Sequence, residues 1–383
     1  MTLEQNLRNA ALSGQQKVAK LPVVSVVALA VVSGFFGGAV GLFMVGLMWW
    51  ISGNPWVRDD AHSHGISEQD SSRLGGVIIA LGYIGFAVVS SNQFSAASAS
   101  GQEFASPLIA AESLFLWGLV AMVGMWDDFV SNIAAPARLT LVSIFSLLWV
   151  VITPGVSQLE AYAWLPALLA HEAVLVIACA FVITAFVNAG NMADGANGLL
   201  SGICLAFFTF TFFEYSSQSV FALIMALTIF IVFNVGTGKI FLGDFGSYGL
   251  SSAVAMTALV MYGSGNYTMW LLASIVSYRC VGLVRVFAQR AARKISPMQA
   301  GNDHTHNFLY RVCRQAGLGR IAANSLTGCA IAIVSAAIPA GLAMTGVLAR
   351  TDTAAWLGYF VAYIVLHIAA ARLLKISAEQ SAS

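Results

Sequence analysis

The chain has 383 residues, of which 58% are hydrophobic and only 9% are charged, and its formal net charge is +1. A soluble domain carries about 25% charged residues, so this composition excludes a water-soluble globular protein, and the near-zero net charge gives no sign of nucleic-acid binding. The apolar segments lack the alternation of barrel strands, and lipid leaves backbone polar groups no other partner, so the sequence predicts an all-α, polytopic integral membrane protein.

About eleven apolar segments approach the roughly 20 residues that a membrane span needs. They are residues 23–51, 74–91, 107–126, 139–153, 173–187, 199–215, 219–233, 247–262, 268–289, 321–347 and 355–371. Several are short, so we expect about 10–11 transmembrane helices. We interpret residues 1–22 as a polar N-terminal tail, 23–375 as a single membrane-embedded domain and 376–383 as a C-terminal tail.

The first apolar segment is too long for a signal-peptide core and is expected to be retained as one tilted span. Polar motifs follow the odd-numbered segments, whereas the loops after the even-numbered segments carry no such motif. Because alternate loops face the same side, the chemistry should gather on one membrane face. Outside the ninth segment, twelve Lys and Arg residues fall on that face and four on the other, which predicts a cytoplasmic site. Taken alone, Lys17 and Lys20 favour a cytoplasmic N-terminus, which would put the polar motifs on the outer face unless the first segment makes two passes.

Asp127 and Asp128 end the third segment within GMWDDFVSN. Two adjacent carboxylates repel each other unless a cation or a proton intervenes, and such a pair is costly at a membrane boundary. The pair favours a role with a divalent metal, a cationic substrate group or a phosphate-bearing substrate. A solvated helix end also fits these two residues taken alone.

The stretch FVNAGNMADGANGLLSG, residues 186–202, is rich in glycine and in amide side chains. Glycine lets the backbone approach a ligand closely, and amides with a carboxylate suit a nucleotide or a sugar. The candidate binding residues here are Asn188, Asn191, Asp194 and Asn197. A plain turn between two helices is the alternative, although such a turn needs fewer of these residues.

The stretch FNVGTGKIFLGDFGS, residues 233–247, carries Lys239 and Asp244. A single carboxylate suits magnesium, which takes few protein ligands together with waters and substrate phosphates. Lys239 is expected to meet a phosphate, although no GK[ST] pattern of a P-loop is present. A polar turn is again the alternative.

The stretch SPMQAGNDHTHNFLYR, residues 296–311, places His304 and His306 before Arg311. No cysteine or carboxylate set completes a tetrahedral zinc site around the two histidines. Histidine and arginine in a basic stretch favour phosphate binding, with a solvated interhelical loop as the alternative.

At these four motifs the chain resembles the polyprenyl-phosphate N-acetylhexosamine-1-phosphate transferases, glycosyltransferase family 4. The matching residues are 124–128, 188–199, 241–247 and 297–306, in the family's order. Two positions differ: Asn197 stands where many members have aspartate, and Asn307 replaces the third histidine of an HxHH run. The family includes the enzymes that start peptidoglycan lipid, O-antigen, teichoic acid and enterobacterial common antigen synthesis.

The resemblance implies transfer of a HexNAc-1-phosphate, or a related amino-sugar-1-phosphate, from a UDP-amino sugar to undecaprenyl phosphate, with release of UMP. It implies Asp127, Asp128 and Asp244 as catalytic residues, and Mg²⁺ or Mn²⁺ held by Asp244 and Asp194. The expected location is the bacterial inner membrane, with the site on the cytoplasmic face. Membrane lipids are expected partners, nucleic acid is not, and a homodimer is left open.

Two other classes of function remain open at this point. A multi-spanning transporter also uses intramembrane acids and broken helices, but it predicts acids in mid-segment and two matching halves of the chain. A catalytically inactive family member is the other alternative, suggested by Asn197 and Asn307. Release of UMP by the purified protein separates the three.

Overall fold

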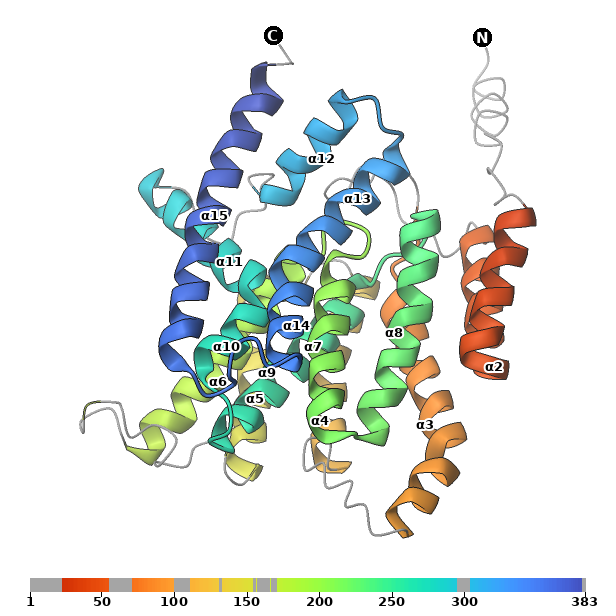
Figure 1. Ribbon diagram of the computed structural model, residues 1–383, viewed down its shortest axis with the longest axis horizontal. Coiled ribbons are helices and arrows are strands. Elements are labelled where there is room, and N and C mark those ends of the chain that lie inside the picture. Colours follow the sequence, from red (N-terminus) through yellow and green to blue (C-terminus); the bar gives the residue numbers. More distant parts are fainter. Residues whose placement is uncertain are drawn as a thin grey trace.

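The computed structural model is a bundle of helices that run roughly along one direction (Figure 1). It describes residues 23–54, 71–99, 111–130, 133–153, 171–294 and 304–380, together with residues 156 and 166. The helices are α2 (Val23–Gly53), α3 (Gly75–Ala99), α4 (Ala111–Val130), α5 (Ala135–Ile152), α6 (Glu172–Ala193), α7 (Leu199–Tyr215), α8 (Gln218–Thr237), α9 (Gly243–Gly263), α10 (Met269–Ile275), α11 (Ser277–Ala292), α12 (Thr305–Gln315), α13 (Arg320–Ala332), a π-helical turn (Ile333–Ala337), α14 (Ile338–Met344) and α15 (Thr353–Gln380).

The all-helical, polytopic membrane fold expected from the sequence is confirmed. Among the described residues, five helical stretches are long and apolar enough to cross a membrane, or six if the bent pair α10–α11 is one span. Large apolar side chains point outward along them, and Phe181 on α6 is 70% exposed. Such a surface is stable only in lipid. The number of 10–11 crossings stays a prediction.

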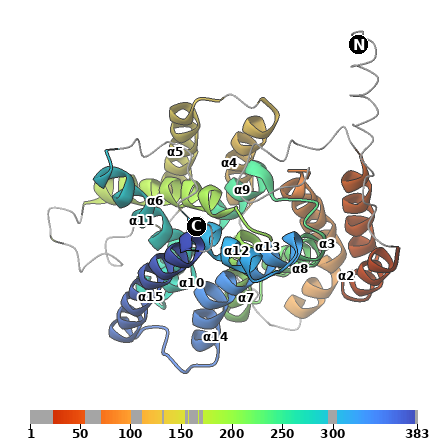
Figure 2. The same cartoon turned by 90° about the horizontal axis from the view of Figure 1, so that it is seen from above.

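The expectation of one tilted span over residues 23–51 is wrong, because α2 folds back on itself. Gly38 adopts φ 54° and ψ −140°, a backbone conformation open in practice only to glycine. The Leu42 side chain lies against Gly34, eight residues earlier, which a continuous helix would place about 12 Å away. Figures 1 and 2 show two arms side by side, so Val23 and Gly53 lie at the same end of the bundle. This is the two-pass arrangement that the sequence leaves open as the alternative to a single span.

The ninth segment, expected as one span over residues 268–289, is also broken. α10 and α11 meet at Val276 with a bend of 83°. The sequence of α11 is much more polar than that of α10, and the helix tilts out of the bundle (Figure 1). The basic stretch that follows contains the short helix α12, and α15 continues to Gln380, past the expected start of the C-terminal tail.

Helix α9 lies at the centre of the bundle, where it packs against α3, α4 and α6 (Figure 2). Its buried face alternates small residues with Tyr248 and Val254, which lets neighbouring helices approach closely. The segment before α9 pairs with the segment before α3: Ser72 N–H donates to the Lys239 carbonyl at 3.1 Å, and Phe241 N–H donates to the Ser72 carbonyl at 2.8 Å. The beginning of α9 is therefore fixed where three helices converge.

Candidate active site

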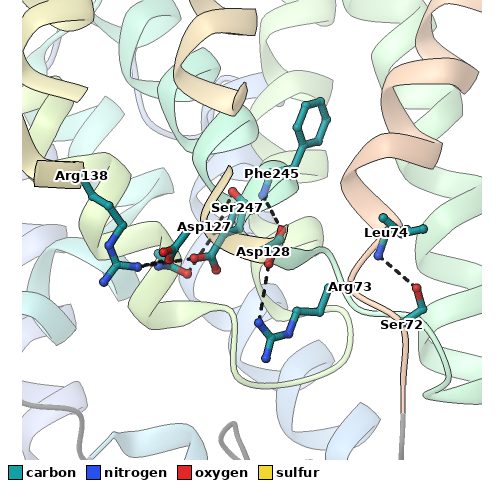
Figure 3. A network of polar contacts seen from close by, with 10 residues as sticks. Ser72, Arg73, Leu74, Asp127, Asp128, Arg138, Phe245 and Ser247 are labelled. Atoms are coloured by element: carbon teal, nitrogen blue, oxygen red, sulfur yellow. Dashed lines mark hydrogen bonds and ion pairs between the residues drawn. The ribbon is translucent and has the colours of Figure 1, made fainter. Parts of the chain in front are cut away.

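The ends of two helices bring three carboxylates together. The last turn of α4 carries Asp127 and Asp128, and the first turn of α9 carries Asp244. The backbone N–H of Phe245 donates to Asp128 Oδ2 at 3.1 Å (Figure 3). Free N–H groups at a helix N-terminus favour an anion, so α9 stabilises the charged form of Asp128. We refer to these three aspartates as the acid cluster.

Gly243 makes this close approach of α4 and α9 possible. Its φ of +69° lies in the left-handed region. A Cβ atom at this position would collide with the Arg73 carbonyl oxygen and would lie 2.9 Å from Asp128 Oδ2. Only glycine fits both the backbone conformation and the space.

Two arginines supply the positive charge of the acid cluster. Arg138, near the beginning of α5, donates from Nη1 to Asp127 Oδ2, and the same nitrogen lies 3.7 Å from Asp244 Oδ2. Arg73, just before α3, places Nη1 3.8 Å from Asp128 Oδ1 (Figure 3). Each arginine side chain is about one-quarter exposed (Arg138 26%, Arg73 25%), so the cluster opens toward solvent on this side.

The two arginines leave the acid cluster short of positive charge. Burial raises the pKa of Asp244 well above its ordinary value, and the hydrogen bond with Asp127 and the charge of Asp128 raise it further. Burial also raises the pKa of Asp128, at the end of α4. Asp128 Oδ1 is buried and accepts no hydrogen bond. A buried carboxylate oxygen that accepts no hydrogen bond and has an arginine no closer than 3.8 Å is suited to a hard divalent cation, which uses few protein ligands.

The turn between α6 and α7 forms the next wall of the site. Asp194 lies there, half-buried, and burial together with the charge of Asp128 raises its pKa to about 7, against the opposing charge of Arg279. Asn191 Oδ1 accepts a hydrogen bond from Ser247 Oγ at 3.3 Å, which ties the end of α6 to α9. The Asn188 amide donates to the Thr184 carbonyl within α6.

Asn197 does not join this group in the structure. Its side chain is buried, and its Nδ2 donates to Ser325 Oγ of α13 at 3.2 Å. Its backbone N–H donates to Asn324 Oδ1 at 2.8 Å. Asn197 thus joins the α6–α7 turn to α13, and any contact with a ligand stays a prediction.

The profile of the family described as "Glycosyl transferase family 4" matches residues 111–262. Over these residues the chain is similar to glycosyl transferase family 4. The match includes the acid cluster and the α6–α7 turn but ends before the histidines of α12. Members of this family are phospho-sugar transferases, and three of the four sequence motifs of this chain lie inside the matched region.

Curated relatives of the chain carry two different names. A phospho-N-acetylmuramoyl-pentapeptide-transferase of Gloeothece citriformis is 27% identical over 314 residues, which cover 76% of each chain. An undecaprenyl-phosphate alpha-N-acetylglucosaminyl 1-phosphate transferase of Yersinia pestis is 28% identical over 34% of this chain and 40% of the relative. A protein of the same name from Thermotoga maritima is 33% identical over 33% of this chain and 40% of the relative. Other relatives are matched over about half of their length, 51%.

His304 and His306 lie at the N-terminus of α12, where His306 borders the α6–α7 turn. His306 is buried, and its ring stacks on that of His304 with centroids 5.2 Å apart. The ring edge of His306 faces Gly195, next to Asp194. Arg311 is exposed one turn further along, and Lys239 is half-buried on the segment that pairs with Ser72.

Two residues that complete the site are absent from the site residues that the sequence predicts. Arg138 bridges Asp127 and Asp244. Its signal in the sequence is a single arginine at the beginning of an otherwise apolar segment, eleven residues after Asp127. Tyr278 gives no such signal, because a tyrosine is not unusual in its segment.

Proposed function

We propose that this transferase moves an amino-sugar-1-phosphate, such as HexNAc-1-phosphate, from a UDP-sugar to undecaprenyl phosphate, with release of UMP, as the initiating step of a cell-envelope glycan. The observation that carries the proposal is the acid cluster, in which Asp127, Asp128 and Asp244 meet two arginines at one end of the bundle. The name of the Yersinia pestis relative states the same class of transfer. We place the site on the cytoplasmic face of a bacterial inner membrane.

The reaction needs little covalent chemistry from the protein, because phosphoryl transfer is mostly positioning and charge stabilisation. An oxygen of the lipid phosphate attacks the phosphorus that bears the sugar. The bond from this phosphorus to the bridging oxygen breaks, and UMP leaves with that oxygen. A phosphate monoester with a second pKa near 6 is mostly ionised at neutral pH, so Asp127 or Asp128 has to orient the lipid phosphate rather than act as a strong base.

The cation of this proposal is Mg²⁺, with Mn²⁺ as an alternative, held by Asp244 and Asp194. Asp128 Oδ1, which accepts no hydrogen bond, and the raised pKa of Asp244 support a cation at this place. Among the described residues no three His, Cys, Asp or Glu side chains are grouped so that they could hold a metal ion by themselves. The proposed cation therefore takes its remaining ligands from water and substrate phosphates. When bound, the cation neutralises charge on the donor diphosphate.

The remaining residues of the proposal act on the nucleotide and the phosphates. Asn188, Asn191 and Asn197 are proposed to hold the nucleotide. Lys239, His304, His306 and Arg311 are proposed to contact phosphate oxygens. The acids lie at helix ends rather than in mid-helix, which favours a transferase over a transporter.

The deciding experiment is UMP release by the purified full chain in detergent, with undecaprenyl phosphate and a panel of UDP-sugars. We expect Asp244→Asn and Asp127→Asn each to abolish release that depends on Mg²⁺. Asp352→Asn is the matched control, because Asp352 lies at the other end of the bundle and caps α15, a position that asparagine also fills. Wild-type rates in both cluster variants would sink the proposal, and no release from any donor would favour an inactive family member or a transporter.

A further inference from the structure

The bend between α10 and α11 places Tyr278 directly against the histidine motif. Tyr278 lies in the first turn of α11, two residues after the break at Val276, and its side chain is buried. His306 lies in the first turn of α12 and is also buried. A straight helix through Val276 would carry Tyr278 away from α12, so the broken helix is what makes this contact.

Tyr278 and His306 are joined by two hydrogen bonds that share one oxygen atom. The backbone N–H of His306 donates to Tyr278 Oη at 3.3 Å. The same oxygen lies 2.8 Å from His306 Nδ1. A phenol has one hydrogen to donate and its oxygen can accept. Because the backbone nitrogen is always a donor, the hydroxyl hydrogen has one acceptor among its contacts in the described part of the chain, and that acceptor is Nδ1.

The opposite tautomer of His306, with the proton on Nδ1, would leave the buried hydroxyl hydrogen of Tyr278 without an acceptor. If Nδ1 carried the proton, Tyr278 Oη would receive two donors and its own hydrogen would point at no acceptor. An unsatisfied buried donor costs about 1–3 kcal/mol. The neutral imidazole of His306 therefore carries its proton on Nε2.

The Nε2 edge of the ring points at the α6–α7 turn. A Cβ atom built on Gly195 would overlap Nε2 and would lie 3.0 Å from both Cδ2 and Cε1 of His306. Burial lowers the pKa of His306 to about 3, with the charges of His304 and Arg285 as smaller causes. The ring is thus neutral, and its N–H faces the backbone beside Asp194.

We propose that Tyr278 is a positioning residue, which holds His306 as the neutral Nε2–H tautomer so that His306 donates a hydrogen bond to a substrate oxygen beside the Asp194–Gly195 turn. In this role His306 is neither a base nor a cation. The tautomer follows from the contacts of Tyr278 alone, whereas its effect on turnover rests on the proposed function.

The test combines nitrogen NMR with kinetics on the full chain in detergent. The chain has 6 histidines, so ¹⁵N-histidine labelling gives a small set of signals, and His306→Gln identifies the one that disappears. In the wild type we expect a protonated Nε2 and an unprotonated Nδ1 for His306. In Tyr278→Phe we expect the Nδ1 signal to move toward a mixture of tautomers. A protonated Nδ1 in the wild type overturns the proposal, even if Tyr278→Phe does not fold.

The kinetic arm separates positioning from general destabilisation. We expect Tyr278→Phe to lower kcat for UMP release by about 10- to 100-fold, the range for lost partners of a functional histidine, with a smaller change in KM for the UDP-sugar. Tyr359→Phe is the matched control, because Tyr359 lies on α15 and its ring packs at a tilt against Trp356, with ring centroids 5.7 Å apart. A folded Tyr278→Phe with unchanged His306 signals overturns the proposal. An inactive wild type with the expected tautomer contradicts the proposed function instead.

Discussion

The two ends of the bundle hold their charged side chains in different ways. Glu214 lies near the end of α7, at the end of the bundle opposite the acid cluster. Its Oε1 atom lies 2.8 Å from Arg350 Nε, which donates to it, and 2.7 Å from Arg350 Nη2. Its other oxygen accepts the Tyr267 hydroxyl at 3.0 Å. We call these three residues the opposite-end clamp. It joins α7 to the loops before α10 and α15 (Figure 1).

The charges of the opposite-end clamp are balanced, whereas those of the acid cluster are not. One carboxylate, one guanidinium and one hydroxyl satisfy both oxygens of Glu214, which is the arrangement of a structural pair. The acid cluster has three carboxylates for two arginines, with Asp194 close enough for the charge of Asp128 to raise its pKa, and Asp128 Oδ1 accepts no hydrogen bond. A site that stays short of positive charge is prepared for a cation that arrives with substrate.

The largest expected difference comes from removing one charge at each end. We expect Asp128→Asn to lower UMP release by about 1,000-fold, with an unchanged or higher melting temperature because repulsion among the acids falls. We expect Glu214→Gln to leave activity within about twofold but to cost about 1–2 kcal/mol of unfolding free energy, because it weakens charge-assisted hydrogen bonds. UMP release and thermal unfolding in detergent measure both. If both variants lose activity equally, the comparison fails.

A smaller effect is expected from the arginines. Arg138→Met removes the cation that bridges Asp127 and Asp244, so the cluster becomes more negative. We expect the Mg²⁺ concentration for half-maximal activity to fall, because the cluster attracts the cation more strongly. We expect kcat to fall about 10- to 100-fold, because a misplaced Asp127 no longer orients substrate. Magnesium titrations of UMP release measure both quantities.

The matched control is Arg350→Met at the opposite-end clamp, for which the magnesium dependence should stay that of the wild type. An unchanged magnesium dependence in Arg138→Met would show that Arg138 lies outside the field of the cation.

The sequence predicted the membrane fold and the acids better than it predicted the shape of the helices around them. The segment 199–215 coincides with α7, and the three aspartates meet as the alternation of loops required. The bend at Val276 has no proline or glycine to signal it, so packing of α10 against α15 and of α11 against α6 and α15 must determine it. The turn at Gly38 lies in an apolar stretch where hydropathy cannot tell a hairpin from a span.

The partners of the acids escaped prediction for a related reason. Arg138 reaches Asp127 across the turn between two helices, and Tyr278 reaches His306 only because α11 is bent. Both contacts depend on the angles between helices, which a periodic apolar pattern leaves undetermined.

The backbone also differs between the two ends of the bundle, as two glycines with positive φ show. Gly243 (φ +69°) is surrounded by Arg73 and Asp128, whereas Gly265 (φ +74°), in the turn after α9, has open space around it. We expect Gly265→Ala to cost about 1–2 kcal/mol for its left-handed conformation and to leave UMP release unchanged. We expect Gly243→Ala to cost more and to lower activity at least tenfold, because the new methyl group displaces Asp128. Equal activity in the two variants, measured beside their melting temperatures, would contradict this role of Gly243.

The smallest expected effect is a difference in acid sensitivity between two histidines. His306 has its pKa lowered to about 3 by burial, against about 6.5 in an unfolded chain. Below pH 6.5 the unfolded state therefore binds a proton that the folded state does not, so this contribution to stability is complete above pH 6.5 and is lost as the pH falls toward 3. Between pH 7 and pH 5.5 the loss is about 1 kcal/mol. We expect His306→Gln to remove this part of the acid sensitivity in thermal unfolding. His171→Gln, at the exposed N-terminus of α6, should leave it in place. If His306→Gln keeps the pH dependence of the wild type, the pKa of His306 is the same in the folded and the unfolded chain, which contradicts a pKa lowered by burial at this position.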